Sequence, residues 1–392
     1  MNPFKFFVPT RLAVGAGCVG TLGSLLEKQG VKSCLIVTDK GVVKAGCVSR
    51  VLRSLDDTSI GYEIYDGVEQ NPTEDNVGEA LDAVSQNGFG AIVAVGGGSA
   101  IDTAKAAVAL MIERCDIREL YTRDVVGQAP VTLVAVPTTA GTGSEMTRSA
   151  VITNKEARVK QTIRGDSLYP KMAHVDPELT VSLPKSITAS TGIDALTHAI
   201  EAYITKNAHA LSDALAIEAT RLIFGNLRKA VNDGSDIEAR SNMCVASTLG
   251  GLTFSISGLG MVHAMAEPLG GRYNVPHGVA NSVLLPYCLS FNCDAVSKKL
   301  AFLARVLGIS NDYDETDKKS VEMAAIAVVD AVQQLSADVG IPQRIQKIKL
   351  TKKEFSKLTN DALKNSCLPA NPKKAGREDL KRIYAMVLDV DD

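Results

Sequence analysis

The hydrophobic pattern divides the chain into two halves with different spacing of apolar residues. Up to about residue 183, short runs rich in β-forming residues alternate with segments of helical spacing. The runs are CLIVT at 34–38, IGYEIY at 60–65, AIVAV at 91–95 and VTLVAV at 131–136. Alternation of this kind predicts a parallel β-sheet covered by helices.

From Leu183 and Pro184 onward, the pattern changes to long segments rich in alanine and leucine. Their spacing predicts helical segments around 189–232, 236–256, 281–307, 319–338 and 374–388. Pro184 marks the boundary, because proline fixes its own φ and biases the preceding residue away from helix. We therefore expect an α/β domain over 1–183 and an all-helical domain over 184–392.

Composition limits the classes of partner. The 392 residues are 45% hydrophobic, and the net charge of -2 is dispersed, so we expect no contact with nucleic acid or an anionic membrane. No apolar run approaches the ~20 residues of a membrane-spanning helix. The start, MNPFKFFVPTRL, lacks the pattern of a secretory signal, and the eight cysteines form no CxxC pair. These features predict a cytoplasmic protein with reduced thiols that acts on small molecules.

A glycine-rich turn follows the third of the β-rich runs. The stretch AIVAVGGGSAIDTAKAAVALM predicts a buried strand, a turn of Gly96, Gly97, Gly98 and Ser99, and then a helix. Glycines let a phosphate approach the backbone, and the helix N-terminus supplies free N–H groups and a positive dipole end. Alone, the element is as consistent with a plain tight turn as with a pyrophosphate site.

An early carboxylate complements this turn. Asp39 ends the first strand, where it can accept hydrogen bonds from a ribose diol and would repel a 2′-phosphate, which favours NAD over NADP. It precedes the glycines, whereas the Rossmann acid follows them, so the nucleotide-binding sheet must be a variant. Its position alone equally suits a cap for a helix beginning near Gly41.

The loop PTTAGTGSE at 137–145 is dense in hydroxyls and glycines. Thr138, Thr139 and Thr142 could donate hydrogen bonds to phosphate or carboxamide groups of a cofactor. Unaided, such a loop is also explained by turn chemistry.

Two pairs of metal-ligand residues stand in segments that otherwise belong to a core. Asp194 and His198 lie four residues apart in STGIDALTHAIEAYIT, so they share one helix face. His263 lies on a helical run that Pro268 is expected to end, and His277 starts the next helix. Any one of them could be a hydrogen-bonded core residue or a cap, but together they predict a metal centre.

The ligand types suit a transition metal. One carboxylate and three imidazoles are appropriate for Fe²⁺ or Zn²⁺ and leave coordination space for a substrate oxygen, which favours Lewis-acid catalysis. The other two histidines, His174 and His209, lack comparable partners and are expected to be structural or exposed.

Read together, GGGSAIDTAKA, PTTAGTGSE, STGIDALTHAIEAY and HAMAEPLGGRYNVPHG closely resemble the iron-containing (group III) alcohol dehydrogenase family over nearly the whole chain. The resemblance implies a Rossmann-like dinucleotide-binding domain, a helical metal-binding domain of the dehydroquinate synthase-like type, and a cleft between them. It implies hydride transfer between NAD(H) and the carbon of a small alcohol or aldehyde. It also implies one divalent metal, Fe²⁺ first with Zn²⁺ or Mn²⁺ as alternatives, and a homodimer or larger homo-oligomer.

The resemblance assigns roles position by position. The metal ligands are Asp194, His198, His263 and His277. The cofactor-binding residues are Asp39, Gly96, Gly97, Gly98, Ser99, Asp102, Thr138, Thr139, Thr142, Ser144, Val151, Lys160 and Leu179. The substrate pocket is lined by Thr147, Ser149, Thr162, Arg164, Phe254 and Cys367. Many members carry a second histidine where this chain has Glu267, so Glu267 is either a replacement proton relay or a salt-bridge partner of Arg272.

Arg164 bears on the substrate. Members that act on simple aliphatic alcohols usually have apolar or small groups at the positions of Thr162 and Arg164. A guanidinium there favours a short aldehyde with a sulfonate, phosphonate or carboxylate, such as sulfoacetaldehyde. The alternatives are a solvated arginine on an aliphatic alcohol or 1,3-propanediol dehydrogenase, the related glycerol dehydrogenase or dehydroquinate synthase type, and a non-catalytic metal-binding or filament protein.

Overall fold

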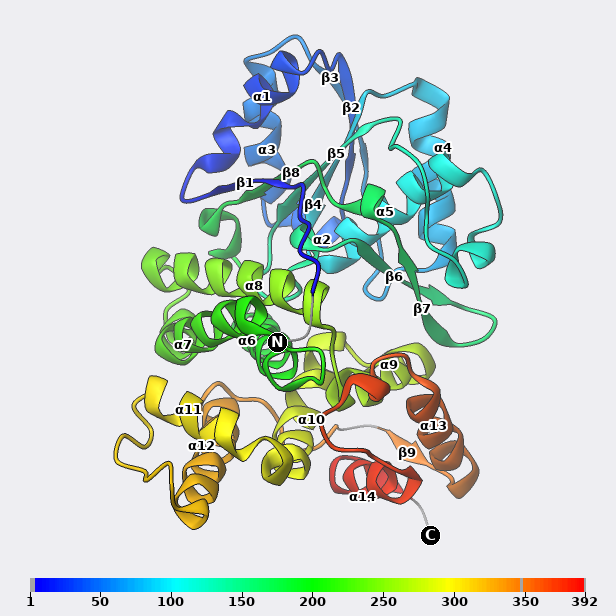
Figure 1. Cartoon of the computed structure of the whole chain (residues 1–392). Coiled ribbons are helices and arrows are strands. Elements are labelled where there is room, and N and C mark those ends of the chain that lie inside the picture. The colour runs from blue at the N-terminus through cyan, green and yellow to red at the C-terminus, as the bar shows by residue number, and fades with distance from the viewer. Residues whose placement is uncertain (1–3, 346–347, 391–392) are drawn as a thin grey trace.

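The N-terminal half is built on one parallel sheet. The computed structural model describes residues 4–345 and 348–390 (Figure 1), so the outermost residues of both predicted domains lie outside the described residues. Six strands pair in the order β1-β8-β5-β4-β2-β3, all parallel. They are β1 Arg11–Val14, β2 Ser33–Val37, β3 Gly61–Tyr65, β4 Ala91–Gly96, β5 Thr132–Pro137 and β8 Met172–Val175. The four β-rich runs are thereby confirmed as β2 to β5.

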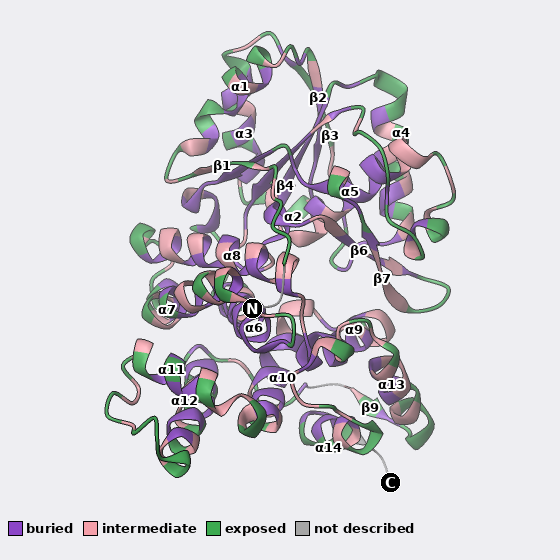
Figure 2. Ribbon diagram, in the orientation of Figure 1, coloured by how far each residue is buried: buried purple, intermediate pink, exposed green. Residues whose placement is uncertain are grey.

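Helices cover both faces of this sheet, as the alternation along β4 requires. Ile92 and Ala94 belong to the core shared with α4 (Glu74–Asn87) and α5 (Gly98–Glu113). Their neighbours Val93 and Val95 belong to the opposite core, with α1 and α3. The remaining helices of this half are α1 Leu22–Lys28, α2 Lys40–Lys44 and α3 Cys47–Asp56. Figure 2 shows the inner strands β2, β4, β5 and β8 as buried, whereas the edge strands β1 and β3 are mostly exposed.

A hairpin stands outside the main sheet. It joins β6 (Ser149–Asn154) antiparallel to β7 (Val159–Arg164), with Ser149 opposite Arg164 and Thr153 opposite Lys160. Ala150, Ile152 and Ile163 on one face of the hairpin are buried in the core around α5. The other face is therefore left to point away from that core.

The C-terminal half is a helical assembly around a single core, and its first helix begins directly after Pro184. Its helices are α6 Lys185–Ile204, α7 Ala210–Asn232, α8 Ile237–Ser257, α9 Met261–Tyr273, α10 His277–Asn292, α11 Ser297–Val306, α12 Lys318–Asp338, α13 Lys352–Lys364 and α14 Arg377–Val387. Short 3-10 turns connect several elements: Cys18–Thr21, Ile117–Tyr121, Ser144–Met146, Asp166–Leu168, Pro177–Thr180, Cys293–Val296 and Leu368–Ala370.

Three details differ from the sequence expectations. The segment 189–232 is two helices rather than one. The half is not wholly helical, because β9 (Lys349–Leu350) pairs in parallel with β10 (Asp389–Val390). The expectation that Pro268 ends its helix is wrong: α9 continues through it to Tyr273. Pro268 and Leu269 are buried there, so packing offsets the ~3 kcal/mol that an interior proline costs a helix.

The eight cysteines are free thiols, as expected, and four of them are fully buried. Among the described residues, no single helix is long and apolar enough to cross a membrane. Only α8 and α9 taken together meet that test, and they are bent by 103° relative to each other.

The backbones of the two halves touch at a pair of glycines. Gly143 follows β5 with φ of +61°, and it lies against Gly251 in the middle of α8. A Cβ built on Gly251 would lie 2.4 Å from the Gly143 carbonyl oxygen and 2.8 Å from its Cα. The two backbones can come this close because neither residue has a side chain.

Candidate active site

The four predicted metal ligands converge in the helical half. Asp194 and His198 lie one turn apart on α6, His263 lies in the first turn of α9, and His277 is the first residue of α10. Their ligand atoms all lie within 4.8 Å of one another. Asp194, His198 and His263 are buried, and His277 is partly exposed, so His277 is the member of the cluster nearest to solvent.

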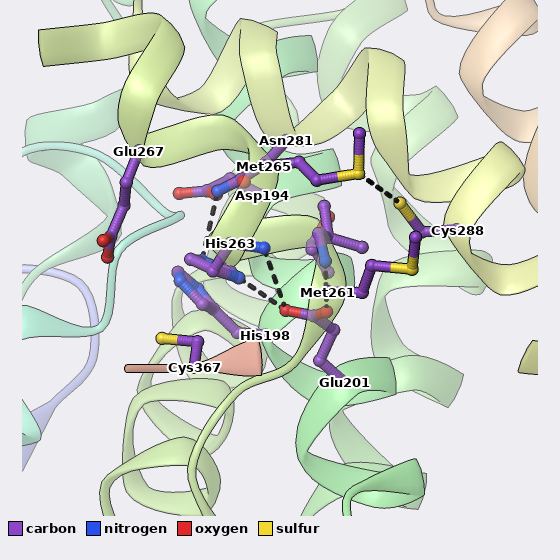
Figure 3. Close-up of polar contacts among 12 residues, drawn as sticks. Asp194, His198, Glu201, Met261, His263, Met265, Glu267, Asn281, Cys288 and Cys367 are labelled. Atoms are coloured by element: carbon purple, nitrogen blue, oxygen red, sulfur yellow. Dashed lines mark hydrogen bonds and ion pairs between the residues drawn. The ribbon is translucent and has the colours of Figure 1, made fainter. Parts of the chain in front are cut away.

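Hydrogen bonds fix the tautomers of two imidazoles. His198 Nδ1 lies 3.2 Å from the carbonyl oxygen of Gly141, and His263 Nδ1 lies 2.7 Å from Glu201 Oε2 (Figure 3). A carbonyl or carboxylate oxygen only accepts, so each Nδ1 carries the proton and each Nε2 keeps its lone pair. The two Nε2 atoms are therefore available to a cation.

Asn281 joins the cluster from the next turn of α10. Its Nδ2 donates to Asp194 Oδ1 at 2.6 Å and lies 3.1 Å from Nε2 of both His263 and His277. The carboxylate oxygen and the two imidazole lone pairs therefore point toward one place. His277 Nδ1 is a buried atom without a hydrogen-bond partner among the described residues.

The protonation states suit cation binding. Burial lowers the pKa of His198 to about 4 and that of His277 well below its ordinary value. Burial alone would raise the pKa of Asp194, but the three surrounding imidazoles and Asn281 outweigh it and lower the pKa. Burial would also lower the pKa of His263, but its hydrogen bond to Glu201 raises it. A carboxylate beside imidazoles that lose their proton readily, as His198 and His277 do, is a ligand set for a divalent metal.

The cluster has the dimensions of a metal site. Ligands around a tetrahedral transition-metal ion, each at ~2.1 Å, are roughly 3.4 Å apart. A group whose ligand atoms span at most 4.8 Å reaches this with small movements. The donor set and the spacing therefore fit one divalent transition metal.

Sequence reasoning missed Glu201 and Asn281, although both follow a readable pattern. Glu201 lies seven residues after Asp194 and three after His198, on the same face of α6, and Asn281 lies four residues after His277 on α10. Such i+3, i+4 and i+7 relations to a ligand are the signal that would have found them.

At the carboxyl edge of the sheet, the glycine turn lies against the threonine loop. A Cβ added to Gly98 would lie 2.9 Å from Thr142 Cγ2, and one added to Gly97 would lie 3.4 Å from Thr139 Oγ1. The helix N-cap, Gly97, offers no side-chain hydrogen bond to α5. The first N–H groups of α5, from Gly98 and Ser99 onward, are therefore free to bind an anion.

Asp39 lies next to this turn because β2 pairs directly with β4. Its Oδ1 accepts from Val42 N at 2.9 Å, so the helix-capping alternative is confirmed for α2. Its Oδ2 lies 3.8 Å from the place of a Cβ on Gly96, whose carbonyl accepts from Thr138 N at 3.0 Å. The strand order thus brings the early acid beside the glycines, as a variant sheet requires.

Asp102 and Lys105, on α5 after the glycine turn, form hydrogen bonds with the segment that leads into the hairpin. Asp102 accepts from Ser144 Oγ at 2.6 Å and from Val151 N at 3.0 Å. Lys105 Nζ is fully buried among five oxygens of Ser144, Thr147 and Ser149, at 2.7 to 3.1 Å. Burial lowers the pKa of Lys105 to about 8, and burial raises the pKa of Asp102.

Lys105 was missed by sequence reasoning. The signal was a lone basic residue in the helix AIDTAKAAVALM, which is apolar apart from Asp102, Thr103 and Lys105. The Thr147 hydroxyl, predicted to line the substrate pocket, is buried and accepts from Lys105 instead.

One face of the hairpin carries five predicted site residues. Alternation places Lys160, Thr162 and Arg164 on one side of β7, with Val151 and Ser149 opposite Thr162 and Arg164 on β6. Lys160 reaches α9, where a Cβ on Gly270 would lie 2.7 Å from its Cε. Burial, the larger effect, lowers the pKa of Lys160, while Glu267, Asp102 and Asp194 oppose the change. This face therefore looks toward the metal cluster.

Of four further predicted residues, two lie beside the cluster and two do not. The Phe254 ring lies 4.5 Å from the His198 ring. Cys367 lies beside the cluster, and Glu267 is set apart from it (Figure 3). Burial, the largest effect, raises the pKa of Cys367 well above its usual range, and Arg164 partly opposes this. Leu179 is buried in the sheet core with α1 and α3.

The salt-bridge alternative for Glu267 is wrong. Arg272 pairs with Asp361, whereas Glu267 accepts a hydrogen bond from Asn365 Nδ2. The two histidines outside the cluster are structural, as expected. His174 lies buried on β8 and bonds to the carbonyl oxygen of Cys18 at 3.2 Å, and His209 caps α7.

Known proteins resemble this chain along nearly its whole length. The family model described as iron-containing alcohol dehydrogenase matches residues 9–177, and the C-terminal model of the Fe-containing alcohol dehydrogenase family matches 188–388. The lactaldehyde reductase of Escherichia coli (strain K12) is 40% identical over 94% of this chain and 96% of its own.

Two solved structures extend the likeness to three dimensions. The alcohol dehydrogenase from Oenococcus oeni superimposes with a TM-score of 0.92 and 38% identity, covering 98% of this chain and 100% of its own. The sulfoacetaldehyde reductase from Bifidobacterium kashiwanohense, in complex with NAD⁺, gives a TM-score of 0.87 and 30% identity, with 98% of each chain covered. The chain therefore belongs to the iron-containing alcohol dehydrogenase family and is an NAD-dependent alcohol oxidoreductase.

Proposed function

We propose that this enzyme reduces a short aldehyde bearing an oxyanion tail, such as sulfoacetaldehyde, with NADH, and catalyses the reverse oxidation. The observation that carries the proposal is the polar face of the hairpin, which leads from Lys160 near the metal cluster to Arg164. Within 4–345 and 348–390 no carboxylate pairs with Arg164, whereas the neighbouring Arg148 is paired with both Asp124 and Asp166. An unpaired guanidinium beside a reaction site favours a substrate with an anionic group.

The residues divide the work between cofactor and substrate. The glycine turn and the N-terminus of α5 hold the pyrophosphate, and Asp39 accepts from the ribose hydroxyls. Asp194, His198, His263 and His277 hold the divalent metal, which when bound supplies Lewis-acid polarisation of the carbonyl. Glu267, one turn after His263 on α9 but set apart from the cluster, relays a proton to the site through water.

A neutral hydroxyaldehyde is the second candidate. The 40% identity to a lactaldehyde reductase favours it, because that protein is named for a small uncharged aldehyde. In this case Arg164 would be a solvated charge at the end of β7, where its side chain is exposed.

We also infer a homodimer, two domains over 1–183 and 184–392, and a cytoplasmic location. The edge strand β1 exposes Leu12 and Val14 along an unpaired side of the sheet, and exposed apolar edges favour pairing with a second copy.

Replacing Arg164 by alanine tests the substrate proposal. We expect kcat/KM for sulfoacetaldehyde and succinic semialdehyde to fall about 10- to 100-fold, the loss of a charge-assisted pair worth 1.5–3 kcal/mol, while propanal and lactaldehyde change little. The measurement is NADH absorbance at saturating cofactor and metal, with Arg148→Ala as a control that removes a nearby but paired guanidinium. Equal losses for all four aldehydes would rule out the anionic tail.

Replacing Asp39 by asparagine tests cofactor choice. Asparagine still caps α2 but carries no charge, so its effect separates repulsion of a 2′-phosphate from helix stability. We expect the kcat/KM ratio of NADPH to NADH to rise by about tenfold or more, corresponding to roughly 1.4 kcal/mol, with an unchanged melting temperature. A lower melting temperature with no change in this ratio would leave Asp39 as a cap alone.

A further inference from the structure

Glu201 has an unusual set of partners for a carboxylate in a helical core. It lies on α6, is only 2% exposed, and makes no bond to a lysine or arginine among the described residues. Its Oε1 accepts from Val262 N at 2.7 Å, and its Oε2 accepts from His263 Nδ1 at 2.7 Å and from His263 N at 3.4 Å. All its hydrogen bonds therefore go to the first turn of one neighbouring helix.

These bonds replace the cap that α9 lacks. The N-cap residue of α9 is Gly260, which has no side chain to accept from the first N–H groups. A Cβ on Gly260 would lie 3.0 Å from Glu201 Oε1, so the glycine is also what lets the carboxylate approach. An anion at a helix N-terminus is stabilised by the free N–H groups and the dipole, which here offsets part of the burial of its charge.

The same carboxylate controls the third ligand of the cluster. Because Oε2 holds the proton of His263 on Nδ1, the ring keeps its Nε2 lone pair toward Asp194, His198 and His277. The backbone bond to His263 N fixes the start of the helix that carries the ring. One side chain on the helix of Asp194 and His198 thus sets both the position and the tautomer of a ligand on another helix.

We propose that Glu201 is a positioning residue of the metal centre. It holds the third ligand, His263, in place by fixing both its imidazole ring and the N-terminus of α9. It does not touch substrate or cofactor, and the proposal holds whichever aldehyde the enzyme reduces. A carboxylate partner of this kind typically raises metal affinity 10- to 100-fold.

The test compares Glu201→Gln with Asn371→Ala. Asn371 Oδ1 accepts from Met261 N at 3.2 Å, so it caps the same helix without touching a ligand. The metal is removed from the full-length protein with a chelator, and Co²⁺ affinity is measured by competition and by its d–d absorption. We expect Glu201→Gln to weaken Co²⁺ binding about 10- to 100-fold and alter the spectrum. Asn371→Ala should lower the melting temperature of the metal-free protein with Co²⁺ affinity within about threefold of wild type.

Unchanged Co²⁺ affinity and spectrum in Glu201→Gln would overturn the proposal, whether or not its melting temperature falls. If this variant does not fold, ¹⁵N resonances of the histidines in the Zn²⁺-loaded wild type decide the matter. The proposal requires a His263 ring protonated at Nδ1 and metal-bound at Nε2, and the opposite arrangement overturns it.

Discussion

Replacing His198 by alanine is expected to lower kcat/KM for every aldehyde by on the order of 10³-fold, because Lewis-acid polarisation is worth several kcal/mol and each 1.36 kcal/mol is tenfold in rate. His198 is buried and is one of the four ligands of the cluster, so its removal takes away a quarter of the protein ligands. The variant should also retain less metal than wild type after dialysis against a chelator. NADH affinity should be unchanged, since the glycine turn lies in the other half of the chain.

The matched control for this variant is His209→Asn. It removes an imidazole that caps α7 by accepting from Ser212 N, and asparagine is an equally good cap. Metal content and kcat/KM should stay at the wild-type level. If His198→Ala likewise kept its metal and stayed within about threefold of the wild-type rate, the cluster would not be the reaction centre.

The part of the site that sequence predicts best is the part made by local spacing. Asp194 and His198 share a helix face because they are four residues apart, and the turn after α9 is short enough to bring His277 back to His263. The glycine turn is similarly local, since a strand, three glycines and a helix follow one another directly. Each of these features needs no knowledge of how distant segments pack.

Features that depend on distant packing do not follow from local spacing, even where, as with Asp39, a strand end and the family resemblance point to the residue. Asp39 precedes the glycines by 57 residues, and only the pairing of β2 with β4 brings it beside Gly96. Lys105 acquires its five oxygens from a loop about forty residues later, and nothing in the helix itself indicates them. At Pro268 a local rule gave the wrong result. Proline usually ends a helix, but α9 continues past Pro268 because the residues that follow it are buried.

The contact between Gly143 and Gly251 is the clearest case of such packing, and it gives the second large prediction. In Gly251→Ala the new Cβ would lie 2.4 Å from the Gly143 carbonyl oxygen, whereas ordinary van der Waals contact begins at 3.4 Å. The obstructing atoms are backbone and cannot rotate away, so the two halves must separate by about 1 Å. Overpacking of this kind costs about 1–3 kcal/mol, more than the ~1 kcal/mol that alanine gains over glycine in a helix.

Gly225→Ala is the matched control, because Gly225 also lies inside a long helix, α7, but has nothing within 4 Å of its Cβ position. We expect it to raise the free energy of unfolding by about 0.5–1 kcal/mol and to leave activity unchanged. Gly251→Ala should instead lower that free energy, by up to about 2 kcal/mol once the helix propensity of alanine is subtracted, as measured by urea denaturation. Equal stabilisation by both substitutions would mean that the two backbones are not in contact in solution.

Activity should fall more steeply than stability in Gly251→Ala. The glycine turn and threonine loop belong to one half of the molecule and the metal cluster to the other, so the distance from nicotinamide to the reacting carbon depends on how closely the halves approach. A displacement of 1 Å can cost about 10²-fold in rate when two reacting groups are held by separate elements. We therefore expect kcat to drop about 100-fold while NADH affinity, a property of the N-terminal half, stays near wild type. A loss of NADH affinity in place of kcat would show that the glycine contact shapes the cofactor site instead of the spacing between the two halves.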